Sequence, residues 1–113
     1  MDNAFNWLKK NGGLCTEQSY PYTASAGTRG TCKTSCKKVA GTAPSSHKDV
    51  SASDSAMMSA LNKGPVSVAI EADKSVFQLY KGGILSNTAC GTKLDHGVLA
   101  VGYGSGYYKV KNS

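Results

Sequence analysis

The stretch HGVLAVGYGSGYYKVKNS, at residues 96–113, decides the fold predicted for this chain. Residues 96–103 form an apolar run that is typical of a strand. Residues 104–106 (GSG) follow as a tight connection, and residues 107–111 (YYKVK) form a second strand-like run. Two such runs joined by a short glycine-containing segment predict an antiparallel hairpin.

The hairpin has a chemical consequence at its open end. If the turn lies at residues 104–106, the other ends of the two strands meet at the open end of the hairpin. His96 and Asn112 lie at these two strand ends. A side-chain amide can accept a hydrogen bond from the imidazole and fix its tautomer and orientation, as the third member of a catalytic triad does. A thiol or hydroxyl nucleophile would complete the set. His47, in a Ser-Ser-His-Lys loop, is expected to be inert.

The rest of the sequence predicts a mixture of helices and strands. The predicted elements are a helix at 2–10, a long loop region at 14–46, a helix capped by Ser53 or Asp54 and ended by Gly64-Pro65, a strand at 66–70 and a helical turn at 75–80. Helix, long loop, helix and then strands is the order of an α+β fold.

Composition limits the possible classes of protein. The chain has 113 residues, 40% of them hydrophobic and 18% charged, which fits one domain or part of a larger one. Its apolar runs are much shorter than the roughly 18 residues of a membrane span, so no membrane partner is expected. The net charge is +6, but the lysines are scattered, with one cluster at Lys33, Lys37 and Lys38. A solvated basic surface is therefore favoured over a nucleic-acid partner.

Four cysteines, Cys15, Cys32, Cys36 and Cys90, favour an oxidising compartment. Cys32 and Cys36 have the spacing of half a zinc site, but the two histidines are too far apart in the sequence to supply the other half, so no metal is expected. Disulfides are the default use of these cysteines. Four cysteines allow three complete pairings, and spacing does not choose among them.

Taken in order, segments along nearly the whole chain resemble the papain-like cysteine peptidases, specifically the cathepsin L-type branch. These segments are MDNAF at 1–5, NGGL at 11–14, TEQSYPY at 16–22, GTCK at 30–33, GPVSVAIEA at 64–72, FQLYKGGI at 77–84, CGTKLDHGVLAVGYG at 90–104 and YYKVKNS at 107–113. The ordered set is specific, although no single segment would suffice.

The resemblance implies a fold and its division. Residues 1–48 are expected to be the end of the helical left domain of the papain-like fold. Residues 49–113 are expected to form most of the antiparallel β-barrel right domain, truncated before its last strands. The chain is thus expected to be an internal fragment of the mature enzyme.

The resemblance also implies roles for particular residues. His96 matches the catalytic histidine, and Asn112 matches the residue that orients it. Four residues match positions that line the main specificity pocket, which would prefer bulky hydrophobic side chains: Met1, Ala69, Leu94 and Gly97. Tyr80 is expected to be a packing residue.

The sequence departs from the family at the nucleophile. Relatives carry it in a QGxCGSCW-like segment at the start of a long helix, which this chain lacks, and Cys15 matches no nucleophile position. In relatives, Cys32 pairs with an upstream cysteine and Cys90 with a downstream one, and neither partner is in this chain. Cys15 and Cys36 are extra, and a bridge between these two is a hypothesis.

These observations predict a cysteine-type endopeptidase that needs no metal or organic cofactor. This chain is expected to supply the histidine and asparagine half and to be inactive alone. The expected partners are a peptide or protein substrate, an N-terminal segment carrying the nucleophile, and a propeptide or cystatin-type inhibitor. The expected location is lysosomal, vacuolar or extracellular. The alternative is a noncatalytic homologue that acts as a binding or inhibitory module.

Overall fold

The computed structural model describes residues 1–113, which form two compact units, Met1–Lys48 and Asp49–Ser113. The division falls at the boundary expected from the sequence. The assignment of the two units to the left and right domains of the papain-like fold stays a prediction.

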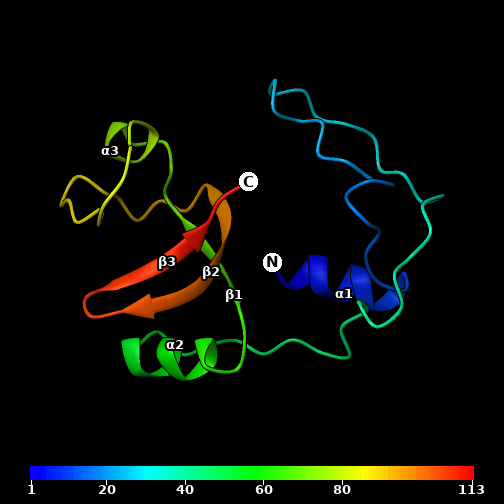
Figure 1. Cartoon of the computed structure of the whole chain (residues 1–113), viewed down its shortest axis with the longest axis horizontal. Helices are drawn as coiled ribbons and strands as arrows, with labels where there is room; N and C mark the ends of the chain where they lie inside the picture. The colour runs from blue at the N-terminus through cyan, green and yellow to red at the C-terminus, as the bar shows by residue number, and fades with distance from the viewer. The chain divides into compact units, whose positions relative to one another are not determined.

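The first unit begins with helix α1 (Asp2–Lys10), which confirms the predicted helix (Figure 1). Asp2 lies in its first turn and Lys9 and Lys10 in its last turn, where each charge is favourable to the helix dipole. The helix ends at Asn11, whose backbone N–H and side-chain amide both donate to the Trp7 carbonyl.

The remainder of the first unit is a long loop closed on itself. A disulfide joins Cys15 and Cys36. This is the bridge hypothesised from the sequence, between the two cysteines that are extra relative to the papain-like family. An isolated β-bridge pairs Cys15 with Lys38, and the Val39 N–H donates to the Leu14 carbonyl at 2.8 Å. These contacts bring the two ends of the loop together without regular secondary structure between them.

The second unit holds the sheet, and its predicted helix, helical turn and three strands are confirmed. Its elements are α2 (Asp54–Leu61), β1 (Val66–Ile70), α3 (Ser75–Gln78), β2 (His96–Gly104) and β3 (Tyr107–Lys111). Ser53 caps α2 by accepting a hydrogen bond from the Ala56 N–H. The strands form an antiparallel sheet in the order β1-β2-β3, with β2 in the centre (Figure 1). A closed barrel is thus not seen within these residues.

The β2–β3 hairpin contains a β-bulge. Gly102 pairs with Lys109, and Ala100 pairs with Val110, so three residues of β2 are matched by two of β3. The extra residue is Val101, which lies between Ala100 and Gly102 at the register shift. A bulge of this kind reverses the alternation of side chains in one strand only.

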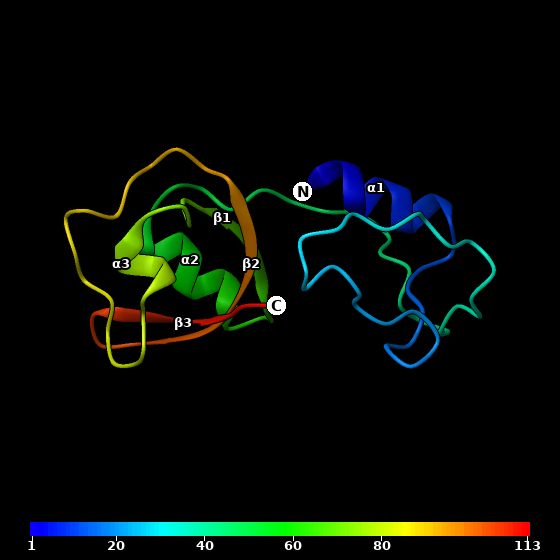
Figure 2. The same cartoon turned by 90° about the horizontal axis from the view of Figure 1, so that it is seen from above.

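Helix α2 is attached to the sheet by two tyrosines, and Figure 2 shows it lying against the strands. The Tyr103 hydroxyl donates to Asn62 at 3.0 Å and the Tyr108 hydroxyl donates to Asp54 at 2.6 Å. The carboxylate of Asp54 raises the pKa of Tyr108 because it accepts the phenol hydrogen. The paired tyrosines thus hold both ends of α2 on one face of the hairpin.

The hydrophobic core is small. Val98 and Ala100, both on β2, are its buried apolar residues, and Ala100 is only 1% exposed. Every residue of β3 is exposed. No helix of this chain has the length and apolar character needed to cross a membrane.

We predict that Ala100→Leu lowers the free energy of unfolding by about 1–3 kcal/mol, because the added atoms must displace close-packed neighbours. Urea denaturation of the 113-residue chain measures this change. Ala69→Leu is the matched control, since it adds the same atoms at an exposed position of the neighbouring strand β1. Equal losses in the two variants would contradict the core position of Ala100.

Candidate active site

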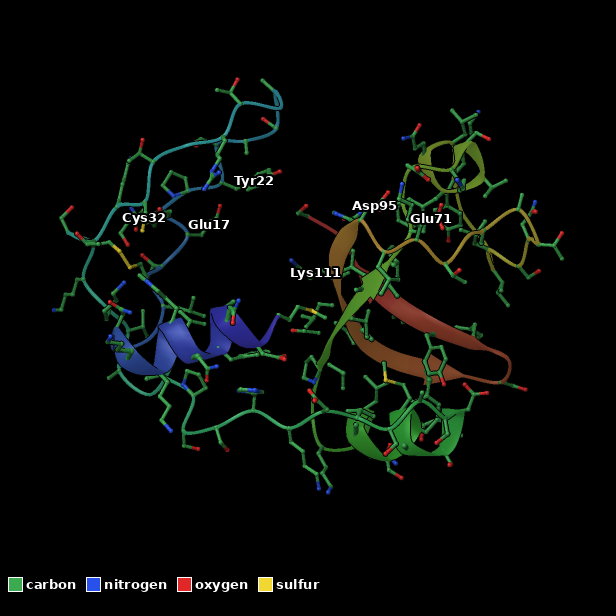
Figure 3. The ribbon with its side chains drawn as sticks, turned by 180° about the vertical axis from the view of Figure 1, so that it is seen from behind. Glu17, Tyr22, Cys32, Glu71, Asp95 and Lys111 are labelled. Atoms are coloured by element: carbon green, nitrogen blue, oxygen red, sulfur yellow. A yellow bond between two sulfur atoms is a disulfide. The ribbon has the colours of Figure 1, made fainter.

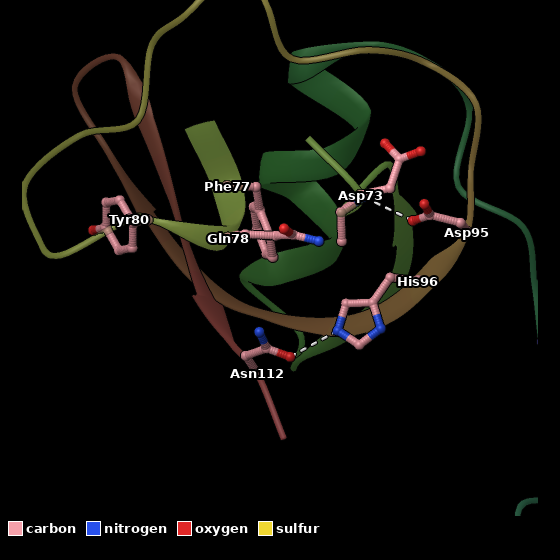
Figure 4. Close-up of a pocket in the computed structure, with 8 residues that line it drawn as sticks. Asp73, Phe77, Gln78, Tyr80, Asp95, His96 and Asn112 are labelled. Carbon is pink, nitrogen blue, oxygen red and sulfur yellow. Dashed lines mark hydrogen bonds between the residues drawn. The ribbon is translucent and has the colours of Figure 1, made fainter. Parts of the chain in front are cut away.

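The structure brings His96 and Asn112 together, as the hairpin predicted. His96 opens β2, and Asn112 directly follows β3. The His96 Nε2 lies 2.8 Å from the Asn112 Oδ1, and this contact is drawn in Figure 4. The same oxygen accepts the Ser113 backbone N–H at 2.9 Å, which holds the amide in place.

This contact defines which nitrogen of His96 can act as a base. An amide oxygen only accepts hydrogen bonds, so Nε2 must carry the hydrogen that lies between the two groups. The Nδ1 of the neutral ring then keeps its lone pair. A ring oriented in this way can take a proton at Nδ1 from a neighbouring acid such as a thiol.

The bulge at Val101 is the reason that the two side chains meet. Successive side chains of a strand point to opposite faces. If the same residues paired regularly from Tyr103 and Tyr108 onward, Asn112 would lie opposite Leu99, on the other face from His96. Because Val101 is left unpaired, Lys111 pairs with Leu99 and Asn112 comes level with Val98, on the same face as His96 and diagonal to it.

The residue before His96 anchors the start of β2. The Asp95 N–H donates to the Ile70 carbonyl at 3.0 Å, and the Asp95 carboxylate accepts the Ala72 N–H at 2.7 Å. Ile70 also pairs with His96 across the β1–β2 ladder. The end of β1 therefore fixes the backbone of the histidine and of the residue before it.

An open hollow of about 630 Å³ lies beside the imidazole (Figure 4). Its lining comes from the segment after β1, from the start of β2 and from the end of β3: Ala72, Asp73, Phe77, Gln78, Tyr80, Asp95, His96 and Asn112. Sequence reasoning did not place Phe77 or Gln78 at a site, and it expected Tyr80 to be a packing residue. Tyr80 is in fact half exposed and lines the hollow, so that expectation is wrong.

A signal for these missed residues was present in the strand order. In an antiparallel pair, the residues that leave the end of one strand lie beside the beginning of the next. Because β1 ends opposite His96, the segment that follows β1 had to pass close to the imidazole.

The four expected specificity residues are not gathered around this hollow. Ala69 and Gly97 are direct partners across β1 and β2, and both are exposed. Leu94 is 64% exposed, two residues before His96. Met1 belongs to the first unit and is exposed there. Their role as a specificity pocket stays a prediction.

The free thiols lie away from the hollow. Cys32 and Cys90 are unpaired and exposed, and neither lines the space beside His96. Groups of three or more residues that could hold a metal ion are not found. Within this chain, neither free thiol thus lines the hollow beside the His96–Asn112 pair.

A buried carboxylate, that of Glu71, contacts the loop at residues 90–95 that leads to His96. The side chain of Glu71 is 4% exposed; it accepts the Lys93 N–H at 2.5 Å and pairs with the Lys74 ammonium at 2.8 Å. The hydrogen bond from Lys74, followed by that from Lys93, holds the pKa of Glu71 below its usual value. Glu71 in turn, followed by Asp73, raises the pKa of Lys74.

Comparisons with known proteins identify the family of this chain. The family model described as papain family cysteine protease matches residues 1–113. The senescence-specific cysteine protease SAG39 of Oryza sativa subsp. indica is 42% identical over 121 residues, covering 100% of this chain and 33% of that protein. The KDEL-tailed cysteine endopeptidase CEP2 of Arabidopsis thaliana is 45% identical over 118 residues, covering 100% of this chain and 32% of that protein.

A solved structure shows the same fold. The crystal structure of a Carica candamarcensis cysteine protease superposes with a TM-score of 0.83 and is 34% identical, covering 99% of this chain and 51% of that one. The chain belongs to the papain family of cysteine proteases. It spans about a third of the length of the curated relatives that it matches.

We predict that inserting one alanine between Lys111 and Asn112 abolishes the contact between His96 and Asn112, because one added residue moves the amide to the opposite face of the sheet. NMR of the imidazole in the 113-residue chain measures this as loss of the downfield, exchange-protected Nε2–H signal. Deleting Val101 is the control, since it removes the unpaired residue but leaves Ala100 opposite Val110, and it should keep the contact. Amide signals of the β1–β2 ladder verify that the sheet persists, and a retained Nε2–H signal in the insertion variant would refute the explanation.

We predict that Glu71 makes the chain more stable at neutral than at acidic pH. Its pKa is lower in the folded state than in the unfolded one, so its stabilising effect is complete above the ordinary carboxyl pKa and is lost as pH falls through the lowered value. Urea midpoints of the wild type and Glu71→Gln, measured from about pH 6 to about pH 3, should converge toward the acidic end. A difference between the two urea midpoints that does not change with pH would contradict this prediction.

Proposed function

We propose that this chain is part of a cysteine endopeptidase, to which it contributes the general base His96 and the orienting residue Asn112. The observation that carries the proposal is the 2.8 Å contact between the imidazole Nε2 and the amide oxygen, which leaves Nδ1 as the basic nitrogen. Family membership supplies the reaction class, the hydrolysis of peptide bonds through a thiolate.

The proposed mechanism assigns two proton transfers to His96. Its Nδ1 takes the proton of a cysteine thiol, and the thiolate attacks the carbonyl carbon of the substrate. The imidazolium then gives that proton to the leaving amine, so the acyl group stays on sulfur until water releases it. Asn112 holds the ring in one orientation throughout, which keeps Nδ1 directed at the reacting atoms.

The nucleophile is proposed to come from a segment outside these 113 residues. Cys15 and Cys36 are joined to each other, and the two free thiols do not line the hollow beside His96. The chain also spans only about a third of its curated relatives. We therefore propose that residues 1–113 act within a longer peptidase and have no turnover by themselves.

Further parts of the proposal concern domains, specificity and location. Residues 1–48 and 49–113 are proposed to belong to the helical and barrel domains, in a cathepsin L-like arrangement. Met1, Ala69, Leu94 and Gly97 are proposed to line an apolar specificity pocket. The relative CEP2 is KDEL-tailed, and such a tail is read in the secretory pathway. With the disulfide of the first unit, this supports a lysosomal, vacuolar or extracellular location.

A peptide amidase assay tests the function. In the longer protein, His96→Ala is expected to lower kcat by about 10²–10⁴-fold, because it removes the general acid and base. Asn112→Ala is expected to cause a smaller loss, since the ring is still present but less well oriented. Lys109→Ala, at an exposed position of β3, is the control and should leave the rate unchanged.

The 113-residue chain alone gives the complementary measurement. No hydrolysis is expected from it, and hydrolysis that a thiol alkylator abolishes would show that Cys32 or Cys90 is the nucleophile. Substrate binding without turnover in the longer protein would instead favour a noncatalytic binding or inhibitory module.

A further inference from the structure

Glu71 is the buried charged residue of this chain, and it directly follows β1. A carboxylate removed from water is costly unless its oxygens are hydrogen-bonded and its charge is compensated. Glu71 has both kinds of partner, the Lys93 N–H on one oxygen and the Lys74 ammonium on the other. Figure 3 shows it next to Asp95, at the end of β1.

The two partners of Glu71 differ in kind. Lys74 is only three positions from Glu71 in the sequence and also pairs with Asp73 at 3.3 Å, so this ion pair stays within the segment that follows β1. The bond to the Lys93 N–H is short, part-buried and made to the backbone of a distant segment. The Glu71 carboxylate therefore constrains the backbone of the segment that contains Lys93.

The loop at residues 90–95 is shaped around the carboxylate. A Cβ atom added at Gly91 would overlap the carboxylate of Glu71, so any larger residue there would have to displace either the loop or the end of that side chain. Gly91 and Lys93 thus contact the same carboxylate from two positions of the loop.

This loop leads directly to the proposed site. Lys93 is followed by Leu94, then by Asp95, whose backbone and side chain are bound to the end of β1, and then by His96. Asp95 is held by its own contacts, but the solvent-exposed Leu94 is not. The position of Leu94 is set by its two neighbours, Asp95 on one side and Lys93, which Glu71 holds, on the other.

We propose that Glu71 is a positioning residue that sets the place of Leu94, and through it the substrate preference of the peptidase. It acts through the hydrogen bond from Lys93 and the close contact with Gly91. The inference rests on the proposed function, because Leu94 determines specificity only if this loop borders a substrate. Glu71 itself touches neither the substrate nor His96.

The first test measures the loop in the 113-residue chain. A charge-assisted bond shifts the Lys93 amide proton downfield, and Glu71→Ala should remove that shift together with the slow hydrogen exchange of this amide. Glu71→Gln should retain part of both, because its amide oxygen still accepts. Lys74→Gln is the matched control and should change neither, whereas a loss of the Lys93 signal in this variant would mean that the surface ion pair, not Glu71, orders the loop.

A double-mutant cycle separates contact with the loop from general destabilisation. Gly91→Ala alone should displace the loop and shift the Lys93 amide, because its methyl group meets the carboxylate. In the Glu71→Ala background the same methyl group has space, so adding Gly91→Ala should have little further effect. Additive effects of the two changes would overturn the proposal.

The second test measures specificity in the longer protein. The ratio of kcat/KM for a substrate with a bulky apolar side chain to that for a small one should fall by about tenfold in Glu71→Ala. The ratio should recover partly in Glu71→Gln, and in Lys74→Gln it should stay within about twofold of the wild-type ratio. A general loss of stability would lower both rates together and leave the ratio unchanged.

The outcomes distinguish the two proposals. If the wild-type longer protein does not hydrolyse peptides, the proposed function fails, and the amide measurements still decide whether Glu71 orders the loop. If the wild type is active and the ratio is unchanged in Glu71→Ala, the specificity role of Glu71 is refuted while the function stands.

Discussion

The arrangement of the site depends on the register of the β2–β3 hairpin, in which Val101 is left unpaired. Strands alternate their side chains with a period of two residues, so a shift of register by one residue moves a side chain to the opposite face. Leaving Val101 out of the pairing lets Tyr103 and Tyr108 hold α2 at one end of the hairpin while His96 and Asn112 share a face at the other. If the same residues paired regularly from the turn onward, Asn112 would lie on the face opposite His96.

The sequence was informative where the structure depends on local periodicity. The two strands of the hairpin, the strand at 66–70 and both longer helices follow from alternation, capping and glycine stops, and all are present. The meeting of His96 and Asn112 was also predictable as a meeting of strand ends. The reason for it was not, because the turn residues and the apolar pattern of β2 do not reveal an extra residue in the middle of a strand.

Local sequence patterns do not predict contacts between segments that are far apart in the chain. Glu71 ends an alternating strand and looks like an ordinary exposed charge, and only the return of residues 90–95 buries it. The same is true of Phe77 and Gln78, which line the hollow because the segment that follows β1 passes beside the start of β2. The family resemblance supplied the expected roles of residues, but it did not supply these contacts.

The disulfide of the first unit gives the exposed loop a property of its own. Cys15 and Cys36 are 21 positions apart, and most residues between them face solvent, where a neighbouring protease can reach them. Because the crosslink joins the two ends of that segment, a cut inside it would leave both pieces covalently attached. A nicked molecule would migrate as a single species until a reducing agent separated its parts.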